Sequence, residues 1–384
     1  MITTFRYPNR IVFGPGAITQ LPDLLTEHNA ERVLLVTDQG LVDAGLADRI
    51  QAETNKVATT TLFPEVEPNP TESCVDRAAQ LLRDESCDLV IGLGGGSAMD
   101  AAKAAALREK HHAAFTVYEI QIGGDANMTE TVCPIIAIPT TAGTGSEVGR
   151  SAVVTLAEWN RKAVICGPKL LPSVAVCDPE LTLGLPPRIT AATGMDALTH
   201  NIEAYCSTFY HPICDAVALG GIRLAAENLE TAVKEGQDIE ARSNMMLSSS
   251  MGAIAFQKDL GAAHSMAHPL STVAGVPHGL ANAIVLAHIL EYNKPVAAER
   301  LGAIAQAMGC DVGGRSEEDR ADAAIEAVKS LTERIDIPKS LSAVGVTEDQ
   351  IPEMVQQAVA DPNHVTNPRP CTAEDFTNLY HQAL

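Results

Sequence analysis

Short apolar runs alternate with helix-forming segments over the first half of the chain. Four of these runs are continuous, as expected for strands that are buried on both faces of a parallel sheet. They are RVLLVTD (32–38), DLVIGLGGGS (88–97), PIIAIPTTAGTGSE (134–147) and SVAVCDPE (173–180). A strong helix-forming segment, AMDAAKAAAL, directly follows the second run. The order strand, loop, helix therefore predicts a doubly wound α/β domain, in which ligands bind at the carboxyl ends of the strands.

The pattern changes after GLPPR (184–188), where two consecutive prolines favour a boundary. From Thr190 to the end, alanine-rich patterns of helical period replace the strand-like runs, as in ADAAIEAVKSL (321–331). We therefore predict an α/β domain with a parallel sheet over residues 1–185 and an all-α domain over residues 186–384.

Composition sets further bounds on the fold and the location. The chain has 384 residues, 46% hydrophobic and 20% charged, which suits two globular domains with separate cores. No run approaches the 18 apolar residues of a membrane span, and the N-terminus lacks the features of a secretory signal. The nine cysteines form no CxxC pair, which indicates reduced thiols. We expect a cytoplasmic protein with no membrane partner.

The formal net charge of −21 argues against a nucleic-acid partner, because such binding depends on Lys and Arg at phosphates. The same charge opposes an anionic cofactor at long range. Such a cofactor would therefore need a local site, such as the N-terminus of a helix.

A group of histidines in the second half indicates a metal site. Five of the 11 histidines fall between residues 200 and 288, namely His200, His264, His268, His278 and His288. In MDALTH, Asp196 and His200 are four residues apart and share one face of a helix. A single histidine is more often structural than a ligand, but one carboxylate with three imidazoles suits Fe²⁺ or Zn²⁺. We predict that Asp196, His200, His264 and His278 bind a divalent metal.

The glycine-rich GLGGGS indicates a nucleotide site, because glycines let the backbone and a helix N-terminus approach a pyrophosphate. Gly92 and Gly94 fit the GxGxxG pattern, but Ser97 occupies its third position, so a structural turn is an alternative. Asp38 ends an earlier strand, where an acid accepts hydrogen bonds from a ribose 2′-hydroxyl and repels a 2′-phosphate. This favours NAD over NADP, although the usual order of acid and glycine loop is reversed here.

A third loop follows the strand at 134–139. It carries the hydroxyl groups of Thr140, Thr141, Thr144 and Ser146. These groups can bond a phosphate or a ribose, or they can cap the following helix.

Seven motifs together resemble the iron-containing (group III) alcohol dehydrogenases, a family that includes lactaldehyde reductase and 1,3-propanediol dehydrogenase. They are FGPGA (13–17), GGGSAMDAAK (94–103), PTTAGTGSE (139–147), ATGMDALTHNIEAY (192–205), AHSMAHPL (263–270), GVPHGLANAI (275–284) and NPR (367–369). Their order and separations agree with the family over essentially the whole chain.

The resemblance implies an N-terminal dinucleotide-binding domain, a helical C-terminal domain and a cleft that holds the metal and the nicotinamide. It implies the same four metal ligands, with His268 beside the metal rather than on it. It also implies a homodimer or a larger homo-oligomer. The positions where the family contacts NAD(P) are Asp38, Asn69, Gly95, Gly96, Ser97, Asp100, Thr140, Thr141, Thr144, Lys162 and Leu181.

The chain departs from related sequences at SEVGRS, where many of them carry Thr after Glu-Val. Position 151 lies near the substrate in the family, so Ser151 and Arg150 are substrate candidates. Arg150 suits a substrate carboxylate, since guanidinium pairs with it in bidentate fashion. A surface ion pair or a contact to cofactor phosphate is the more common use of such an arginine.

These residues predict an NAD-dependent dehydrogenase of small primary alcohols or aldehydes. The metal would polarise the oxygen, the nicotinamide would carry the hydride, and His268 would either relay a proton or orient a ligand. Pro269 disfavours helix at His268, so we expect a kink that aims this ring separately from His264. The family favours Fe²⁺, and the ligand set also accepts Zn²⁺.

Three alternatives remain open at this stage. One is reduction of a carboxylate-bearing semialdehyde of the 4-hydroxybutyrate type, which Arg150 would motivate. Another is a lyase that resembles dehydroquinate synthase and also uses NAD and metal, although it requires more Lys and Arg than these motifs supply. The last is a structural metal-binding protein.

Overall fold

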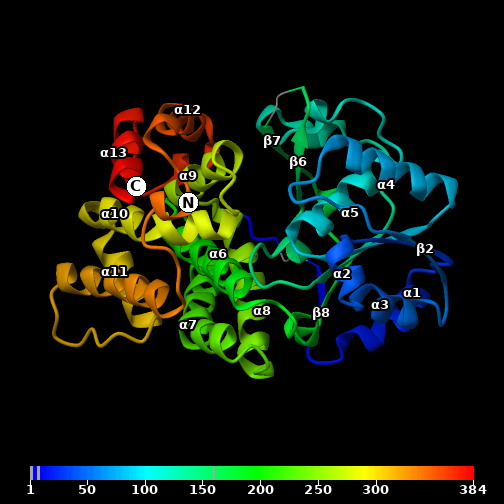
Figure 1. Cartoon of the computed structure of the whole chain (residues 1–384), viewed down its shortest axis with the longest axis horizontal. Helices are drawn as coiled ribbons and strands as arrows, with labels where there is room; N and C mark the ends of the chain where they lie inside the picture. The colour runs from blue at the N-terminus through cyan, green and yellow to red at the C-terminus, as the bar shows by residue number, and fades with distance from the viewer. Residues whose placement is uncertain (1–2, 7–8, 159–160) are drawn as a thin grey trace. The chain divides into compact units, whose positions relative to one another are not determined.

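The computed structural model describes residues 3–6, 9–158 and 161–384 (Figure 1). By its internal contacts the chain forms two compact units. Residues 7–141 and 145–182 form an α/β unit, and residues 1–6, 142–144 and 183–384 form a helical unit. The predicted fold class, a parallel α/β part followed by an all-helical part, is confirmed.

The α/β unit is built on a six-stranded parallel sheet of order β1-β8-β5-β4-β2-β3. Its strands are β1 (Arg10–Phe13), β2 (Arg32–Val36), β3 (Thr59–Phe63), β4 (Leu89–Gly94), β5 (Ile135–Pro139) and β8 (Val174–Cys177). Its helices are α1 (Leu21–Glu27), α2 (Gln39–Asp43), α3 (Leu46–Thr54), α4 (Glu72–Asp84) and α5 (Gly96–Arg108). An antiparallel pair, β6 (Ser151–Leu156) and β7 (Arg161–Cys166), stands apart from the sheet.

Helices cover both faces of this sheet because successive side chains of a strand point to opposite sides. In β2, Leu34 and Val36 pack with α4 and α5, whereas Val33 and Leu35 pack with α1 and α3. All four of these side chains are fully buried. This double burial explains why the strand reads as a continuous apolar run.

The four predicted strands correspond to β2, β4, β5 and β8. The remaining strands were not predicted, for identifiable reasons. The edge strand β1 has only four residues, and β3 begins with three threonines. The strand β6 alternates half-buried and buried positions, which is the period-two pattern of a one-sided strand.

The helical unit contains eight α-helices, and no strand follows β8 in the described chain (Figure 1). They are α6 (Pro187–Cys206), α7 (Pro212–Lys234), α8 (Ile239–Ala255), α9 (Ala262–Val273), α10 (His278–Ala307), α11 (Glu317–Arg334), α12 (Ile351–Ala360) and α13 (Ala373–Ala383). A break at Ala297 interrupts the helical dihedral angles of α10. Among the described residues, no helix combines the length and the apolarity needed to cross a bilayer.

Helix α6 is the central element of this unit and packs against α7, α8 and α10. Each of these neighbours meets α6 at a glycine. A Cβ at Gly221, Gly252 or Gly279 would lie 2.0, 2.9 or 2.3 Å from its nearest α6 atom, respectively. A side chain at any of these positions would therefore push its helix away from α6.

The prediction that Pro269 disfavours helix at His268 was wrong. Helix α9 continues through His268 and includes Pro269 within it. The proline removes one backbone donor, but the surrounding residues Met266, Ala267 and Leu270 are buried in the core of the unit and hold the helix. His264 and His268 therefore lie on the same helix, four residues apart.

Candidate metal centre

The four predicted metal ligands come together in the helical unit. Asp196 and His200 lie on α6, His264 lies on α9, and His278 is the first residue of α10. The ligand atoms of Asp196, His200 and His264 all lie within 4.8 Å of one another. His278 Nε2 is 3.5 Å from Asp196 Oδ1. One carboxylate oxygen and three imidazole nitrogens thus converge on one small volume.

Burial differs among the four groups. The side chains of Asp196 and His264 are 4% and 2% exposed, whereas that of His278 is 27% exposed. The ring of His264 stacks on His200, with centroids 4.6 Å apart. The site is therefore closed on the side of α6 and α9 and accessible beside His278.

The ionisation of Asp196 and His200 suits metal binding, whereas burial works to lower the pKa of His264 but the charge of Glu203 outweighs it and leaves that pKa above its usual value. Burial lowers the pKa of His200 to about 4, against the charge of Asp196, so this imidazole is neutral at pH 7. Burial works to raise the pKa of Asp196, but its electrostatic interactions with His200, His278 and His264 outweigh it and leave the pKa below its usual value. A neutral imidazole and an ionised carboxylate are the forms that bind a divalent cation.

This donor set fits a first-row divalent metal. Nitrogen-rich sites of this kind favour Fe²⁺ or Zn²⁺ over Mg²⁺ and Ca²⁺, which prefer oxygen ligands. The candidate ligand atoms are close enough to one another to bind a single ion.

Two residues beside the predicted ligands were not identified from the sequence. Glu203 accepts a hydrogen bond from Nδ1 of His264 at 2.5 Å. The buried Asn282 has its Nδ2 at 2.8 Å from Asp196 Oδ1 and at 3.2 Å from His264 Nε2. Helical spacing could have indicated both residues. Glu203 is seven residues after Asp196, and Asn282 is four residues after His278, so each shares a helix face with a predicted ligand.

His268 lies beside the predicted ligands. Its ring stacks on that of His278, with centroids 5.2 Å apart, and its side chain is 34% exposed. Its Nδ1 is 2.6 Å from Oδ2 of Asp361, a residue that the sequence did not single out. Burial works to raise the pKa of Asp361, but His268 and the hydrogen-bond donors Asn363 N–H and Ser265 O–H outweigh it and hold the pKa well below its usual range.

His288 is outside this group of side chains. It lies on α10, ten residues after His278, which corresponds to about 15 Å along a helix. Burial lowers its pKa. Of the five clustered histidines, His288 alone is not beside the candidate ligands.

In the α/β unit, three predicted loops meet at the carboxyl ends of the neighbouring strands β2, β4 and β5. Asp38 caps α2 by accepting a hydrogen bond from Leu41 N, and its Oδ2 lies 3.8 Å from the Cβ position of Gly94. Gly94 has a φ of 148°, which disfavours any side chain there. Thr140 N donates to Gly94 O at 3.0 Å. The acid, the glycine turn and the threonine loop are therefore adjacent.

The other predicted cofactor positions are distributed around these loops. Gly95 is the N-cap of α5, and Gly96 and Ser97 form its first turn. Asn69 N donates to Ser97 Oγ at 3.2 Å. Thr141 lies in the loop after β5, and Lys162 lies in β7. Leu181 is buried in the turn after β8. Thr144 belongs to the helical unit.

The side chain of Asp100 forms hydrogen bonds with other residues of the protein. Its Oδ1 accepts from Ser146 Oγ at 2.6 Å and its Oδ2 accepts from Val153 N at 3.0 Å. The fully buried Lys103, which is not among the predicted site residues, donates to the carbonyl oxygens of Ser146 and Ser151. Asp100 and Lys103 together fix the threonine-rich loop and β6 to helix α5.

The two substrate candidates lie at the start of β6. Ser151 is its first residue and is half-buried, and the preceding Arg150 is exposed. No hydrogen bond or ion pair joins the Arg150 side chain to another residue of the described ranges. The sequence alone gave no indication of this exposure.

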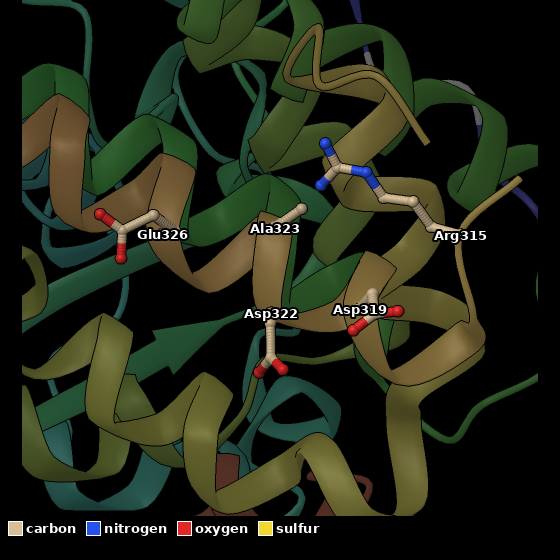
Figure 2. Close-up of a pocket in the computed structure, with 5 residues that line it drawn as sticks. All are labelled: Arg315, Asp319, Asp322, Ala323 and Glu326. Carbon is tan, nitrogen blue, oxygen red and sulfur yellow. The ribbon is translucent and has the colours of Figure 1, made fainter. Parts of the chain in front are cut away.

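An open depression of about 450 Å³ lies elsewhere, on α11 (Figure 2). Arg315, Asp319, Asp322, Ala323 and Glu326 line it. Asp322 accepts from Lys294 and Asp319 from Ser316, so two of its carboxylates already have protein partners. None of the predicted site residues lies on this helix.

Comparison with known proteins gives matches over nearly the whole chain. The family description "Iron-containing alcohol dehydrogenase" matches residues 8–179, and "Fe-containing alcohol dehydrogenase family, C-terminal" matches residues 190–384. The chain is 40% identical to 4-hydroxybutyrate dehydrogenase of Cupriavidus necator, over 98% of this chain and 99% of that protein.

Two further similarities concern 1,3-propanediol enzymes. The chain is 38% identical to 1,3-propanediol dehydrogenase of Citrobacter freundii, over 98% of this chain and 97% of that protein. A crystal structure of 1,3-propanediol oxidoreductase matches with a TM-score of 0.95 and 37% identity, over 100% of both chains.

Proposed function

Since the chain belongs to the iron-containing alcohol dehydrogenase family, we propose that it transfers a hydride between NAD(H) and a small primary alcohol or aldehyde. The observation that supports this most strongly is the convergence of Asp196, His200, His264 and His278. The family membership makes the chain a metal-dependent oxidoreductase, and a lyase or a purely structural metal protein is correspondingly disfavoured.

We assign the two parts of the reaction to the two predicted domains, residues 1–185 for the nucleotide and residues 186–384 for the metal. When bound, the metal supplies a Lewis acid that stabilises negative charge on the substrate oxygen. Asp196 and the three histidines would hold it, and Asn282 would keep the carboxylate of Asp196 in place by its hydrogen bond. Fe²⁺ follows the family, and Zn²⁺ fits the same donors.

The oxidation of an alcohol releases the hydroxyl proton as well as a hydride. His268 is suited to move this proton, because its Nδ1 faces Asp361 and its Nε2 is left for exchange. Its partly exposed side chain allows the proton to reach water. The pairing with Asp361 orients the ring, as a carboxylate does for a catalytic imidazole.

The nucleotide would bind at the glycine turn before α5, where backbone N–H groups and the helix dipole attract the pyrophosphate. Asp38, Gly95, Gly96 and Thr141 are the proposed contacts at these strand ends, together with the family positions named above. The carboxylate of Asp38 would disfavour the 2′-phosphate of NADP, so NAD is the proposed cofactor.

A carboxylate-bearing aldehyde is a second candidate substrate class. Two observations favour it: Arg150 is exposed with no described partner, and one relative at 40% identity is a 4-hydroxybutyrate dehydrogenase. Arg150 would then pair with the substrate carboxylate. The homo-oligomeric state and the cytoplasmic location stay predictions.

The decisive experiment pairs metal analysis of the purified protein with NADH oxidation on short aldehydes and semialdehydes. The protein would be stripped with a chelator and reloaded with Fe²⁺ or Zn²⁺, with Asp196→Ala as the control. Metal-dependent turnover that Asp196→Ala abolishes supports the proposal, and the preferred aldehyde decides the role of Arg150. Bound metal without NADH consumption on any aldehyde would contradict it.

A further inference from the structure

Glu203 is a buried carboxylate in direct contact with His264, one of the proposed ligands. Its side chain is only 4% exposed and lies on α6, seven residues after Asp196 and three after His200. These spacings put all three side chains on one face of the helix. A single stripe of α6 therefore carries two proposed ligands and this additional acid.

Both oxygens of Glu203 bind to helix α9. Its Oε1 accepts from the backbone N–H of Ala263 at 2.6 Å, and its Oε2 accepts from Nδ1 of His264 at 2.5 Å. The first bond caps the start of α9, whose own N-cap, Gly261, has no side chain to do so. The second bond determines which ring nitrogen of His264 carries a proton.

Capping of helix α9 does not by itself require a glutamate at position 203. A serine or an aspartate at position 261 would satisfy an N–H group of α9 without burying a charge deep in the unit. Instead, the glycine at 261 leaves room for the carboxylate, since a Cβ there would lie 2.8 Å from Glu203 Oε1. The local geometry therefore brings the acid to the ring of His264.

We propose that Glu203 is a positioning residue that keeps the His264 proton on Nδ1, presents the Nε2 lone pair to the metal and thereby raises metal affinity. A carboxylate only accepts hydrogen bonds, so it selects the tautomer with hydrogen on Nδ1. His264 Nε2 lies 3.8 Å from Asp196 Oδ1, on the side of the other ligands. The inference rests on the proposed ligand set.

The test is the affinity of the chelator-stripped full-length protein for Co²⁺ at pH 7, measured by competition with a chelating dye and by the Co²⁺ absorption spectrum. Glu203→Gln has the same shape but turns one oxygen into a donor, which opposes either Ala263 N–H or the Nδ1–H tautomer. We expect Co²⁺ binding about 10- to 100-fold weaker, with an altered spectrum, as for other lost partners of ligand histidines.

A matched control separates positioning from capping. Asp238 caps α8 in the same unit by accepting from Ala241 N at 2.9 Å, as Glu203 caps α9. Asp238→Ala should lower the melting temperature and leave Co²⁺ affinity unchanged. An equal loss of affinity in Asp238→Ala would overturn the proposal, because general destabilisation would then explain the effect.

The remaining outcomes are also decisive. A folded Glu203→Gln protein that binds Co²⁺ like the wild type would overturn the inference alone, provided that Asp196→Ala loses binding. Equal binding by the wild type and Asp196→Ala would overturn the ligand set and this inference with it. If Glu203→Gln does not fold, Glu203→Asp replaces it: weaker binding by this shortened acid supports the proposal, and unchanged binding overturns it.

Discussion

Gly279 of α10 lies so close to Ala192 of α6 that a Cβ at position 279 would be 2.3 Å from the Ala192 carbonyl oxygen. The same Cβ would be 3.3 Å from the Cβ of Asp196. Because Gly279 directly follows His278, this contact sets the distance between two of the proposed metal ligands.

Gly279→Ala should therefore destabilise the protein and weaken metal binding together. Overpacking against backbone atoms that cannot move easily should lower the free energy of unfolding by about 1–3 kcal/mol. Gly302→Ala on the same helix is the control, since its Cβ would meet only two side-chain atoms of Arg320, at 3.3 and 3.6 Å. Denaturant unfolding and Co²⁺ titration of both variants test this, and equal results for the two glycines would contradict it.

His278 and His288 form a second matched pair on α10. His278→Ala should weaken metal binding more than about 100-fold, beyond the range for losing an outer partner, and should reduce kcat/KM at least as much. His288→Ala should leave both quantities near their wild-type values. Metal content by elemental analysis and NADH oxidation measure the two effects. Retention of metal by His278→Ala would exclude this residue as a ligand.

His268 has two candidate roles, which kinetics and metal affinity distinguish. As a proton relay, His268→Gln should lower kcat by about 10²- to 10⁴-fold with metal affinity unchanged. Asp361→Asn keeps the imidazole but loses its orienting partner, so a smaller decrease of about 10- to 100-fold is expected. A loss of metal affinity in His268→Gln, with little change in kcat of the loaded enzyme, would instead show that the ring orients a ligand.

Asp361 should also make stability depend on pH in the acidic range. Its pKa in the folded protein lies below the unfolded value of about 3.9, so folding favours the ionised form. The stabilisation is complete above the unfolded pKa and is lost as the pH falls from about 4 toward the folded value. Asp361→Asn should therefore be less stable than wild type by about 1–3 kcal/mol at pH 7.

The measurement is urea unfolding of both proteins at pH 7 and pH 3.5, with a chelator present to exclude metal. The difference in unfolding free energy should narrow at the lower pH. A constant difference at the two pH values would show that the loss of stability does not depend on the ionisation of Asp361.

Asp38 is the predicted determinant of cofactor choice. Asp38→Ser keeps a side chain that can cap α2 but removes the charge that would repel a 2′-phosphate. We expect the ratio of kcat/KM for NAD⁺ over NADP⁺ to fall by about 10- to 100-fold, equivalent to about 1.4–2.7 kcal/mol. Asp43→Ser, an exposed acid on the same helix, serves as the control. An unchanged ratio would remove Asp38 from the cofactor site.

The proposed metal ligands could be identified from the sequence because their residue types are restrictive and because Asp196 and His200 follow a helical spacing. Their partners could not, since Glu203 and His264 are 61 residues apart and Asp361 and His268 are 93 apart. Glutamate and aspartate are common on protein surfaces, so the residue type alone did not identify Glu203 or Asp361. Only the packing of α6, α9 and the segment after α12 makes them buried hydrogen-bond acceptors.

The secondary structure likewise contains elements that could be predicted from the sequence and elements that could not. Strands buried on both faces, such as β4, are evident as continuous apolar runs. The strand β6 is half exposed, and its alternating pattern in SAVVTL is short enough to pass for a loop. The continuation of α9 through Pro269 depended on tertiary packing that overrides a local preference.

The glycines that face α6 have a consequence for protein engineering. Helices that meet through larger side chains have axes about 8–10 Å apart, and Gly221, Gly252 and Gly279 allow closer approach. Grafting Asp196, His200, His264 and His278 alone onto another helical bundle would therefore not reproduce the site. The host would also need small residues where its helices cross, because backbone spacing decides whether the four side chains can reach a common ion.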